Sequence, residues 1–459
     1  MGEERRRVLI LAGKLGYQTR GFAEAAERLG AETIFATDRC HQLDDPWGDH
    51  AIAVRFERAQ EAARQIAADL KDGVPGAVIA LGDRATPAGA YAARALGVKG
   101  NPPDAVEACR NKLRQRQVLA EAGLQVPDFF SFGVGDDSSR VLPRVKFPAV
   151  VKPLTLAASQ GVVRVNDKEE FERAVGRVRA LLGSPEIQAQ RDAATGRLLV
   201  ESYLPGKECA VEGLLNAGRL RVLAIFDKPD PLEGPYFEET IYVTPSRLSA
   251  AMQGAIADCL ARATRALGLT TGPVHAEFRV NERGPWVLEI APRPIGGLCS
   301  RALRFGPSGA ALEELLLRNA LGLPGADWER EEGASGVMMI PVPRSGIFEG
   351  VEGMDEAERV ANVTEIRITA RLKDYVEAWP EGSSYLGFIF ARANAPGEVE
   401  MALREAHAKL RFRFSPRMIV QHPATAGWFA RDDGSEKGWI REGQDDGRNG
   451  EAGRAKRKD

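Results

Sequence analysis

Cysteine is scarce in this chain of 459 residues, and its spacing argues against two classes of site. The five cysteines form no Cys-x-x-Cys pair and have no partnering run of histidines; they are Cys40, Cys109, Cys209, Cys259 and Cys299. Such scattered residues predict free thiols in a reducing compartment. They argue against a disulfide framework or a zinc site.

Long apolar runs and an excess of charge of one sign are also missing. No stretch reaches the roughly 20 apolar residues that a membrane-spanning helix needs, and the charged start of the chain has no apolar signal-peptide core. The 62 basic and 64 acidic residues give a formal net charge of −2. This balance argues against nucleic acid or an acidic membrane surface as a partner. We therefore expect a soluble, cytoplasmic protein.

The familiar glycine motifs for phosphate are absent as well. The turn from Gly13 to Gly16 lacks the third glycine of a dinucleotide fingerprint, and no acidic residue stands at a strand end about 20 residues further on. No GxxxxGK[ST] segment occurs. We expect this turn to line a substrate cleft at the carboxyl ends of parallel strands.

What the sequence does contain begins with strands that alternate with helices. Segments of strand and helix character follow one another at 7–12, 20–29, 32–36, 58–71, 77–81 and 86–96. This alternation predicts a doubly wound parallel α/β domain over residues 1–104.

Residues 105–325 have an α+β pattern instead. Helices are expected at 105–122, 168–182, 247–267 and 308–321. Strands are expected at 148–152, 161–165, 198–204, 208–216 and 219–226, and a hairpin spans 273–291.

The remainder of the chain divides in two. A small α+β domain is expected over residues 334–425. Its strands are expected near 336–341, 363–371 and 386–392, and its helix near 397–409. Residues 431–459 are Gly-rich, charged and poor in apolar side chains, which predicts a disordered tail.

The hairpin VHAEFRV-NERG-PWVLEIAPR carries the strongest local signal. Closing it around the NERG turn brings Glu277 and Glu289 nearly opposite each other, where like charges destabilise a ladder unless a cation lies between them. Mg²⁺ is typically bound by one or two carboxylates together with substrate phosphates. The alternative is a pair of exposed glutamates on a solvated face.

An arginine and a pair of glycines follow the hairpin. Arg293 can stabilise a transferring phosphoryl group or an acyl oxyanion, and Gly296 and Gly297 can let backbone N–H groups approach a carboxylate. A surface arginine and a flexible loop are the alternative.

Two lysines and a small-residue loop precede the hairpin. Lys112 lies in RNKLRQRQ, and Lys152 ends the strand FPAVVKP. The loop 154–161 follows Lys152 and can fold over phosphates, with Ser159 as a donor. Taken alone, each lysine is more often a surface residue.

The segment LLVESYLPGKECAVEG suits a nucleoside. Backbone groups at the strand end 201–204 can read an adenine edge, and the Glu208 carboxylate can accept both ribose hydroxyls.

Residues 1 to about 325 resemble the ATP-grasp superfamily. The resemblance rests on four motifs in this order: the two lysines, the small-residue loop, E-x-Y-L-P-G-x-E and E-I-x-P-R-x-x-G-G. Within this superfamily the chain is most similar to L-amino acid ligases and carnosine-synthase-like enzymes, whose C-terminal domain resembles residues 334–425. The resemblance implies ATP and Mg²⁺, with Mn²⁺ as an alternative, as cofactors. It implies ATP contacts by Lys112, Lys152, Ser159, Gln160, Gly161, Glu201, Ser202, Tyr203, Leu204 and Glu208.

The same resemblance implies the reactive groups. Glu277 and Glu289 would bind the metal, and Arg293 would be catalytic. Substrate contacts would come from Glu239 (or else Glu238), His275, Arg293, Gly296 and Gly297. The chain departs from the common E-x-N-P-R pattern at Ala291, which leaves the number of metal ions open.

The expected activity is therefore ligation of a carboxylate to an amine, with amino acids as substrates, through an acyl phosphate. A lid over about 145–205 would exclude water. A homodimer is common among such ligases. One rival is a carboxylase of the same superfamily that activates bicarbonate, although the chain has no Met-Lys-Met biotin-carrier segment. Another rival is a nucleotide-binding regulator without catalysis.

Overall fold

The computed structural model describes residues 6–13, 17–38, 51–324 and 327–416. These residues belong to one compact unit, Met1–Pro416. The predicted tail at 431–459, Cys40 and most of the Gly13–Gly16 turn lie outside the described residues. Within the described ranges, no helix combines the length and the apolar character needed to cross a membrane.

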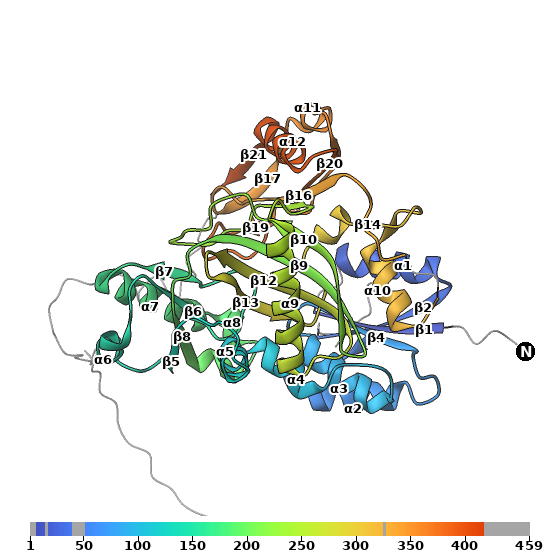
Figure 1. Cartoon of the computed structure of the whole chain (residues 1–459), viewed down its shortest axis with the longest axis horizontal. Coiled ribbons are helices and arrows are strands. Elements are labelled where there is room, and N and C mark those ends of the chain that lie inside the picture. Colours follow the sequence, from blue (N-terminus) through green and yellow to red (C-terminus); the bar gives the residue numbers. More distant parts are fainter. Residues whose placement is uncertain (1–5, 14–16, 39–50, 325–326, 417–459) are drawn as a thin grey trace, which may run out of the picture. The chain divides into compact units, whose positions relative to one another are not determined.

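The N-terminal part is a doubly wound parallel sheet, as the alternating pattern predicts (Figure 1). Its strands lie in the order β3-β2-β1-β4 and are β1 (Arg6–Ala12), β2 (Ala31–Thr37), β3 (Ile52–Ala53) and β4 (Ala77–Leu81). Val8 and Ile10 pack on one face with α1 (Tyr17–Arg28) and α10 (Leu312–Ala320). Leu9 and Leu11 pack on the other with α2 (Ala59–Asp69) and α3 (Thr86–Leu96), and η1 (Phe56–Arg58) precedes α2.

The charged helix predicted over 105–122 is wrong as a single element. The chain forms α4 (Pro103–Arg110) and α5 (Lys112–Glu121), separated by Asn111 in an extended conformation. The Asn111 side chain caps α5 by accepting a hydrogen bond from the backbone N–H of Arg114 at 3.1 Å. The break makes Lys112 the first residue of α5.

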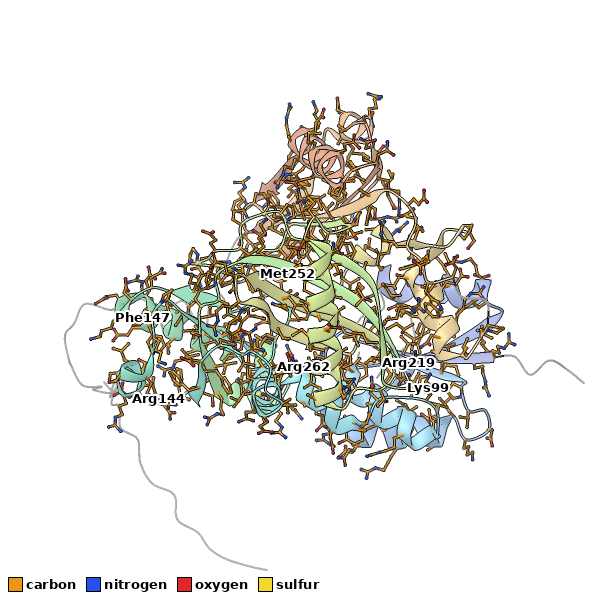
Figure 2. The ribbon with its side chains drawn as sticks, viewed as in Figure 1. Lys99, Arg144, Phe147, Arg219, Met252 and Arg262 are labelled. Atoms are coloured by element: carbon orange, nitrogen blue, oxygen red, sulfur yellow. The ribbon has the colours of Figure 1, made fainter. Side chains whose placement is uncertain are left out.

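A small antiparallel sheet with a helix follows, within and just before the predicted lid. The strands lie in the order β5-β8-β6-β7 and are β5 (Phe129–Gly133), β6 (Ala149–Pro153), β7 (Val163–Val165) and β8 (Arg197–Ser202). Phe171, Val175 and Val178 of α7 (Lys168–Leu182) pack into its core. The short helices here are α6 (Ser138–Val141), η2 (Leu142–Arg144), α8 (Pro185–Gln188) and η3 (Ala193–Gly196). Phe147, labelled with Arg144 in Figure 2, is exposed.

The central sheet carries the hairpin and has the order β13-β12-β9-β10-β11-β16-β20-β18. Its first strands are β9 (Lys207–Asn216), β10 (Arg219–Asp227), β11 (Ile241–Thr244), β12 (Gly272–Asn281) and β13 (Gly284–Ala291). Helix α9 (Ala250–Leu267) packs on it through Ile256 and Leu260, while Arg262 lies on the outer, exposed side of the helix (Figure 2).

The C-terminal part continues this central sheet. The strands β16 (Ala334–Ile340), β18 (Val363–Ile368) and β20 (Gly387–Ala393) extend it beyond β11, and α12 (Pro396–Lys409) and α11 (Met354–Glu358) lie beside them. A three-stranded sheet not expected from the sequence contains β17 (Gly346–Glu352), β19 (Tyr375–Val376) and β21 (Arg411–Ser415). Between the two regions lie η4 (Cys299–Ala302), β14 (Arg304–Phe305) and β15 (Ala310–Ala311).

Candidate active site

The hairpin β12–β13 places Glu277 directly opposite Glu289. Val274, Ala276 and Phe278 are fully buried on the core face, which leaves Glu277 on the other face, as the alternation predicts.

The side chains of the returning strand do not alternate strictly between the two faces, because the register shifts between Glu277 and Phe278. This bulge turns Val287 and Ile290 both into the core. It turns Leu288 and Glu289 both toward a cavity.

That cavity has an apolar part and a charged part. Its apolar lining includes Val150, Val162, Leu204, Phe237 and Leu288, of which Val150, Val162 and Phe237 pack in one cluster. The charged side chains that line it are Lys112, Lys152, Glu201, Glu208, His275, Glu277, Arg279, Glu289 and Arg293. Such a lining suits a ligand with a flat apolar ring at one end and several negative charges at the other.

Lys112 connects the hairpin to the small-residue loop. Its Nζ lies 3.2 Å from Glu289 Oε2 and donates a hydrogen bond to the carbonyl of Leu156 at 2.8 Å. Leu156, Ala158 and Ser159 all have positive φ angles, so the loop turns tightly and presents its backbone at the cavity wall.

Lys152 belongs to a buried ionic triad with Glu201 and Arg116. Glu201 Oε2 lies 2.6 Å from Lys152 Nζ, and Glu201 Oε1 accepts from Arg116 Nε at 2.7 Å. Burial lowers the pKa of Lys152 to about 8, although the Glu201 carboxylate opposes the shift. Burial alone would raise the pKa of Glu201, but the two cations hold it below its usual value.

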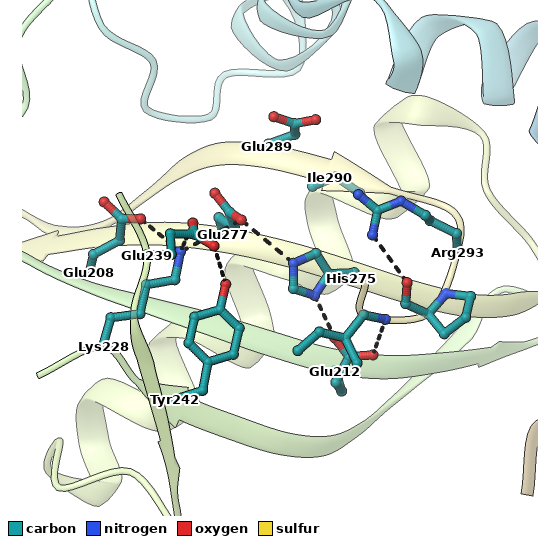
Figure 3. Close-up of polar contacts among 12 residues, drawn as sticks. Glu208, Glu212, Lys228, Glu239, Tyr242, His275, Glu277, Glu289, Ile290 and Arg293 are labelled. Carbon is teal, nitrogen blue, oxygen red and sulfur yellow. Dashed lines mark hydrogen bonds and ion pairs between the residues drawn. The ribbon is translucent and has the colours of Figure 1, made fainter. Parts of the chain in front are cut away.

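A buried lysine, Lys228, is surrounded by three carboxylates (Figure 3). Its Nζ lies 2.8 Å from Glu208 Oε1, 2.5 Å from Glu239 Oε1 and 3.6 Å from Glu277 Oε1. Burial would lower the pKa of Lys228, but these carboxylates raise it well above its usual value. Burial and the neighbouring Glu277 raise the pKa of Glu239 to about 7.

Arg279 completes the surroundings of Glu208. Its Nε donates to Glu208 Oε2 at 2.9 Å, and its Nη1 donates to the carbonyl of Gly206 at 3.2 Å. The Arg279 side chain is only 4% exposed, so it ties Glu208 rigidly to the chain that follows β8.

His275 joins the hairpin to the glycine pair. Its Nδ1 lies 2.5 Å from Glu212 Oε1, and Glu212 Oε2 accepts from the backbone N–H of Ile295 at 3.2 Å. Burial would lower the pKa of His275, but the Glu212 carboxylate outweighs it and raises the pKa to about 9. A protonated His275 with Nε2 3.6 Å from Glu277 acts as a counter-charge there.

Most of the predicted site residues line the one cavity. They are Lys112, Lys152, Ser159, Glu201, Ser202, Tyr203, Leu204, Glu208, His275, Glu277, Glu289 and Arg293. Five do not. Glu239 reaches the site through Lys228, and Gln160 points away and donates to the carbonyl of Glu381. Gly161, Gly296 and Gly297 also lie outside the lining.

Several residues were not singled out from the sequence. Arg116, Glu212 and Asp83 contact Glu201, His275 and Arg293, which lie between 63 and 210 residues away in the chain, so no local pattern reveals them. A local signal exists for Lys228, which directly follows the buried second half of β10, much as Lys152 lies one residue before the end of β6. Arg279 stands on the same strand face as His275 and Glu277.

Comparison with known proteins places this site in a family. Residues 145–302 match the ATP-grasp domain, and residues 338–415 match the L-amino acid ligase C-terminal domain 2. The chain thus contains an ATP-grasp domain followed by an L-amino acid ligase C-terminal domain. The crystal structure of the L-amino acid ligase from Bacillus licheniformis is similar over 90% of this chain and 100% of its own, with a TM-score of 0.76 and 28% identity.

Two relatives of this ATP-grasp chain are also ligases or synthases by name. Alanine–anticapsin ligase of Bacillus subtilis is 27% identical over 220 residues, which is 45% of this chain and 46% of that protein. Carnosine synthase 1 of Gallus gallus is 30% identical over 240 residues, 50% of this chain and 25% of that one. The chain thus spans less than half the length of these relatives. All three of these proteins are ligases or synthases by name.

Proposed function

We propose that this protein is an ATP- and Mg²⁺-dependent carboxylate–amine ligase that forms an amide bond, of peptide type, through an acyl phosphate. The observation that supports it best is the single cavity in which an apolar slot continues into lysines, an arginine and opposed carboxylates. The C-terminal match to L-amino acid ligases favours amino acids as substrates.

The nucleotide extends along the whole length of this cavity. Adenine lies in the slot of Val150, Val162 and Phe237, beside the backbone of 201–204. The ribose hydroxyls meet Glu208, which Arg279 holds in place. The phosphates then run toward Lys112, Lys152 and the positive-φ loop at Ser159.

The metal would be held by Glu277 and Glu289. The donor set fits Mg²⁺, because both carboxylates line the cavity on neighbouring strands and an oxygen-rich site with few protein ligands suits this ion. Ala291 offers no side-chain ligand, and the phosphates would complete the coordination. When bound, the ion supplies charge neutralisation on the transferring phosphoryl group.

The reaction follows from these placements. A substrate carboxylate oxygen attacks the γ-phosphorus in line, the bond to the β-phosphate oxygen breaks, and ADP leaves. Lys112 and Lys152, which line the cavity, balance the charge that the phosphoryl group carries. The neutral amine nitrogen then attacks the acyl carbon, Arg293 stabilises the oxyanion, the acyl carbon–oxygen bond to phosphate breaks, and the proton that the nitrogen loses leaves with the departing hydrogen phosphate. With its pKa raised to about 9 by Glu212, His275 would carry a positive charge near neutral pH and balance the neighbouring Glu277.

The acyl phosphate has to be kept from water. The lid strands carry Lys152, and Gln160 at the lid loop donates to the carbonyl of Glu381 in the C-terminal part at 3.1 Å. We infer that the lid, residues 145–205, closes the cavity in this arrangement during turnover.

The substrates enter near Glu239 and the glycine pair. Glu239 would read the substrate amino group, and backbone N–H groups at Gly296 and Gly297 would approach the carboxylate. Activation of bicarbonate remains the rival activity, since it would use the same nucleotide residues. Cytoplasmic location and homodimerisation stay predictions from the sequence.

The first experiment is ADP release with ATP and Mg²⁺ over the twenty amino acids, singly and in pairs. Glu289→Gln serves as the inactive control. Release that requires a pair and disappears in the control supports a dipeptide-type ligase and identifies its substrates. Release with bicarbonate alone, or ATP binding without release under any condition, would reject the ligase.

A further inference from the structure

Arg293, the proposed catalytic arginine, is held by a carboxylate from the N-terminal part of the chain. Arg293 Nε donates to Asp83 Oδ1 at 2.8 Å, and Arg293 Nη2 donates to Asp83 Oδ2 at 3.0 Å. The Arg293 side chain is 13% exposed and that of Asp83 26%. A two-point contact of this kind fixes both the position and the plane of the guanidinium.

The Asp83 side is itself rigid. Asp83 stands in the turn between β4 and α3, after Gly82 with its φ of +80°. The Thr86 hydroxyl donates to the Asp83 carbonyl at 2.9 Å, and the backbone N–H of Ala85 donates to the Gly82 carbonyl at 3.2 Å. The carboxylate is therefore presented from a fixed turn at the carboxyl end of the parallel sheet.

The contact with Asp83 leaves some of the N–H donors of the Arg293 guanidinium free for a ligand. A guanidinium has five N–H donors. Two go to Asp83 through the side edge, and one on Nη1 goes to the carbonyl of Pro294 at 3.1 Å. The remaining two, one on Nη1 and one on Nη2, form the end-on edge. Arg293 lines the cavity, so this edge is the one available to a ligand.

We propose that Asp83 is a positioning residue that aims the end-on edge of Arg293 at the reacting acyl group. The N-terminal domain thereby completes the active site across the domain boundary. The proposal rests on the function proposed above for Arg293. The Asp83 carboxylate stays ionised for this role: burial would raise its pKa, but Arg293 holds the pKa below its usual value.

Asp83→Asn is the variant of choice, because it keeps the size of the side chain but offers Arg293 one acceptor in place of two. A misplacement of about 1 Å can cost roughly 100-fold in rate. We expect kcat to fall by about 10- to 100-fold, while the KM for ATP changes by less than about threefold, because Asp83 does not line the nucleotide cavity.

Glu314→Gln is the matched control. Glu314 Oε1 lies 3.1 Å from Arg318 Nη2 and Glu314 Oε2 lies 3.6 Å from Arg28 Nε, so it also bridges α10 and α1 without reaching the cavity. We expect its kcat to equal that of the wild type.

A double-mutant cycle separates positioning from direct binding of substrate. If Asp83 acts only through Arg293, Asp83→Asn has no further effect on kcat in an Arg293→Ala background. An equal fold-loss in both backgrounds, or a raised KM for the amino acid with kcat retained, would overturn the proposal and make Asp83 a substrate ligand.

A second readout does not depend on turnover. The rate at which phenylglyoxal modifies Arg293, followed by peptide mass spectrometry, reports how firmly the guanidinium is held. We expect this rate to rise several-fold in Asp83→Asn and to stay unchanged in Glu314→Gln; equal rates in all three proteins would overturn the proposal. A wild type without ADP release would reject the proposed function, and this rate would still decide the contact with Asp83.

Discussion

The buried triad of Arg116, Glu201 and Lys152 gives the clearest test of the energetics of the site. The side chains are 1%, 5% and 8% exposed, and one carboxylate serves both cations. Arg116 also donates to the carbonyl of Leu288 at 2.6 Å, so the triad ties α5, β6 and β8 to the hairpin. Loss of the triad should therefore lower the stability of the whole central region.

Glu201→Gln removes the charge and leaves the shape. The amide can accept a hydrogen bond from one cation but cannot neutralise either, and removal of one partner from a buried pair costs about 3–5 kcal/mol. We expect a loss of that size in the free energy of unfolding, measured without nucleotide by guanidinium denaturation. The control is Glu61→Gln, because Glu61 pairs with Arg58 at 3.2 Å on an exposed surface where such a pair contributes about 0–1 kcal/mol.

A companion variant tests the cause. Replacing the triad as a whole by apolar residues, with Arg116→Met, Lys152→Met and Glu201→Leu together, leaves no buried charge without a partner. Such replacements are often neutral. We expect the triple variant to recover most of the stability lost by Glu201→Gln. A loss below about 1 kcal/mol for Glu201→Gln alone would refute the reasoning, as would a triple variant less stable than the single one.

Three further predictions concern residues in and around the proposed active site. Since the pKa of Lys152 is about 8 in the free protein and phosphates bind its protonated form, the affinity for ATP should fall by up to about tenfold per pH unit above pH 8. Lys152→Arg should flatten this dependence in a titration by calorimetry. Gly297→Ala should lower kcat/KM for the amino acids by at least about tenfold, because Gly297 has a φ of +63° and a Cβ there would lie 2.9 Å from Phe388 Cζ. Adding Phe388→Leu to this variant should partly restore kcat/KM. Lys228→Met leaves the carboxylates of Glu208, Glu239 and Glu277 without their shared cation, and their ligand atoms lie within 4.8 Å of one another. Without nucleotide, Mn²⁺ should therefore raise the melting temperature of this variant more than that of the wild type. Equal shifts would contradict this last expectation.

Helices and strands whose apolar residues recur at regular spacing could be predicted from the sequence. Features that depend on contacts between residues far apart in the chain could not. The hairpin β12–β13 was predictable because its apolar residues alternate on one face. The bulge in this hairpin was not predictable, because the extra residue on β13 depends on how β13 pairs with β12 and leaves no local pattern in the sequence. The break at Asn111 has a similar origin: besides capping α5, it lets the backbone N–H of Lys112 donate to the carbonyl of Leu154 at 2.9 Å.

The site itself divides in the same way. Glu277 and Glu289 lie close in the chain and their opposition follows from one turn. Asp83 and Arg293 are 210 residues apart, and only the packing of the N-terminal sheet against the hairpin brings them together. The sequence predicts a small domain over residues 334–425; among the described residues β16 pairs with β11, so the strands of this part continue the central sheet, which no local pattern reveals.

The central claim is that a carboxylate is activated as an acyl phosphate, and an isotope measurement tests it most directly. The protein is supplied with ATP, Mg²⁺ and the amino acid pair that gives ADP release, with ¹⁸O in the carboxyl group of the acyl partner. We expect one ¹⁸O from this carboxylate to appear in the released phosphate, seen as a shifted ³¹P resonance, in equal amount to the amide formed. Phosphate that contains no ¹⁸O while amide accumulates would contradict the account.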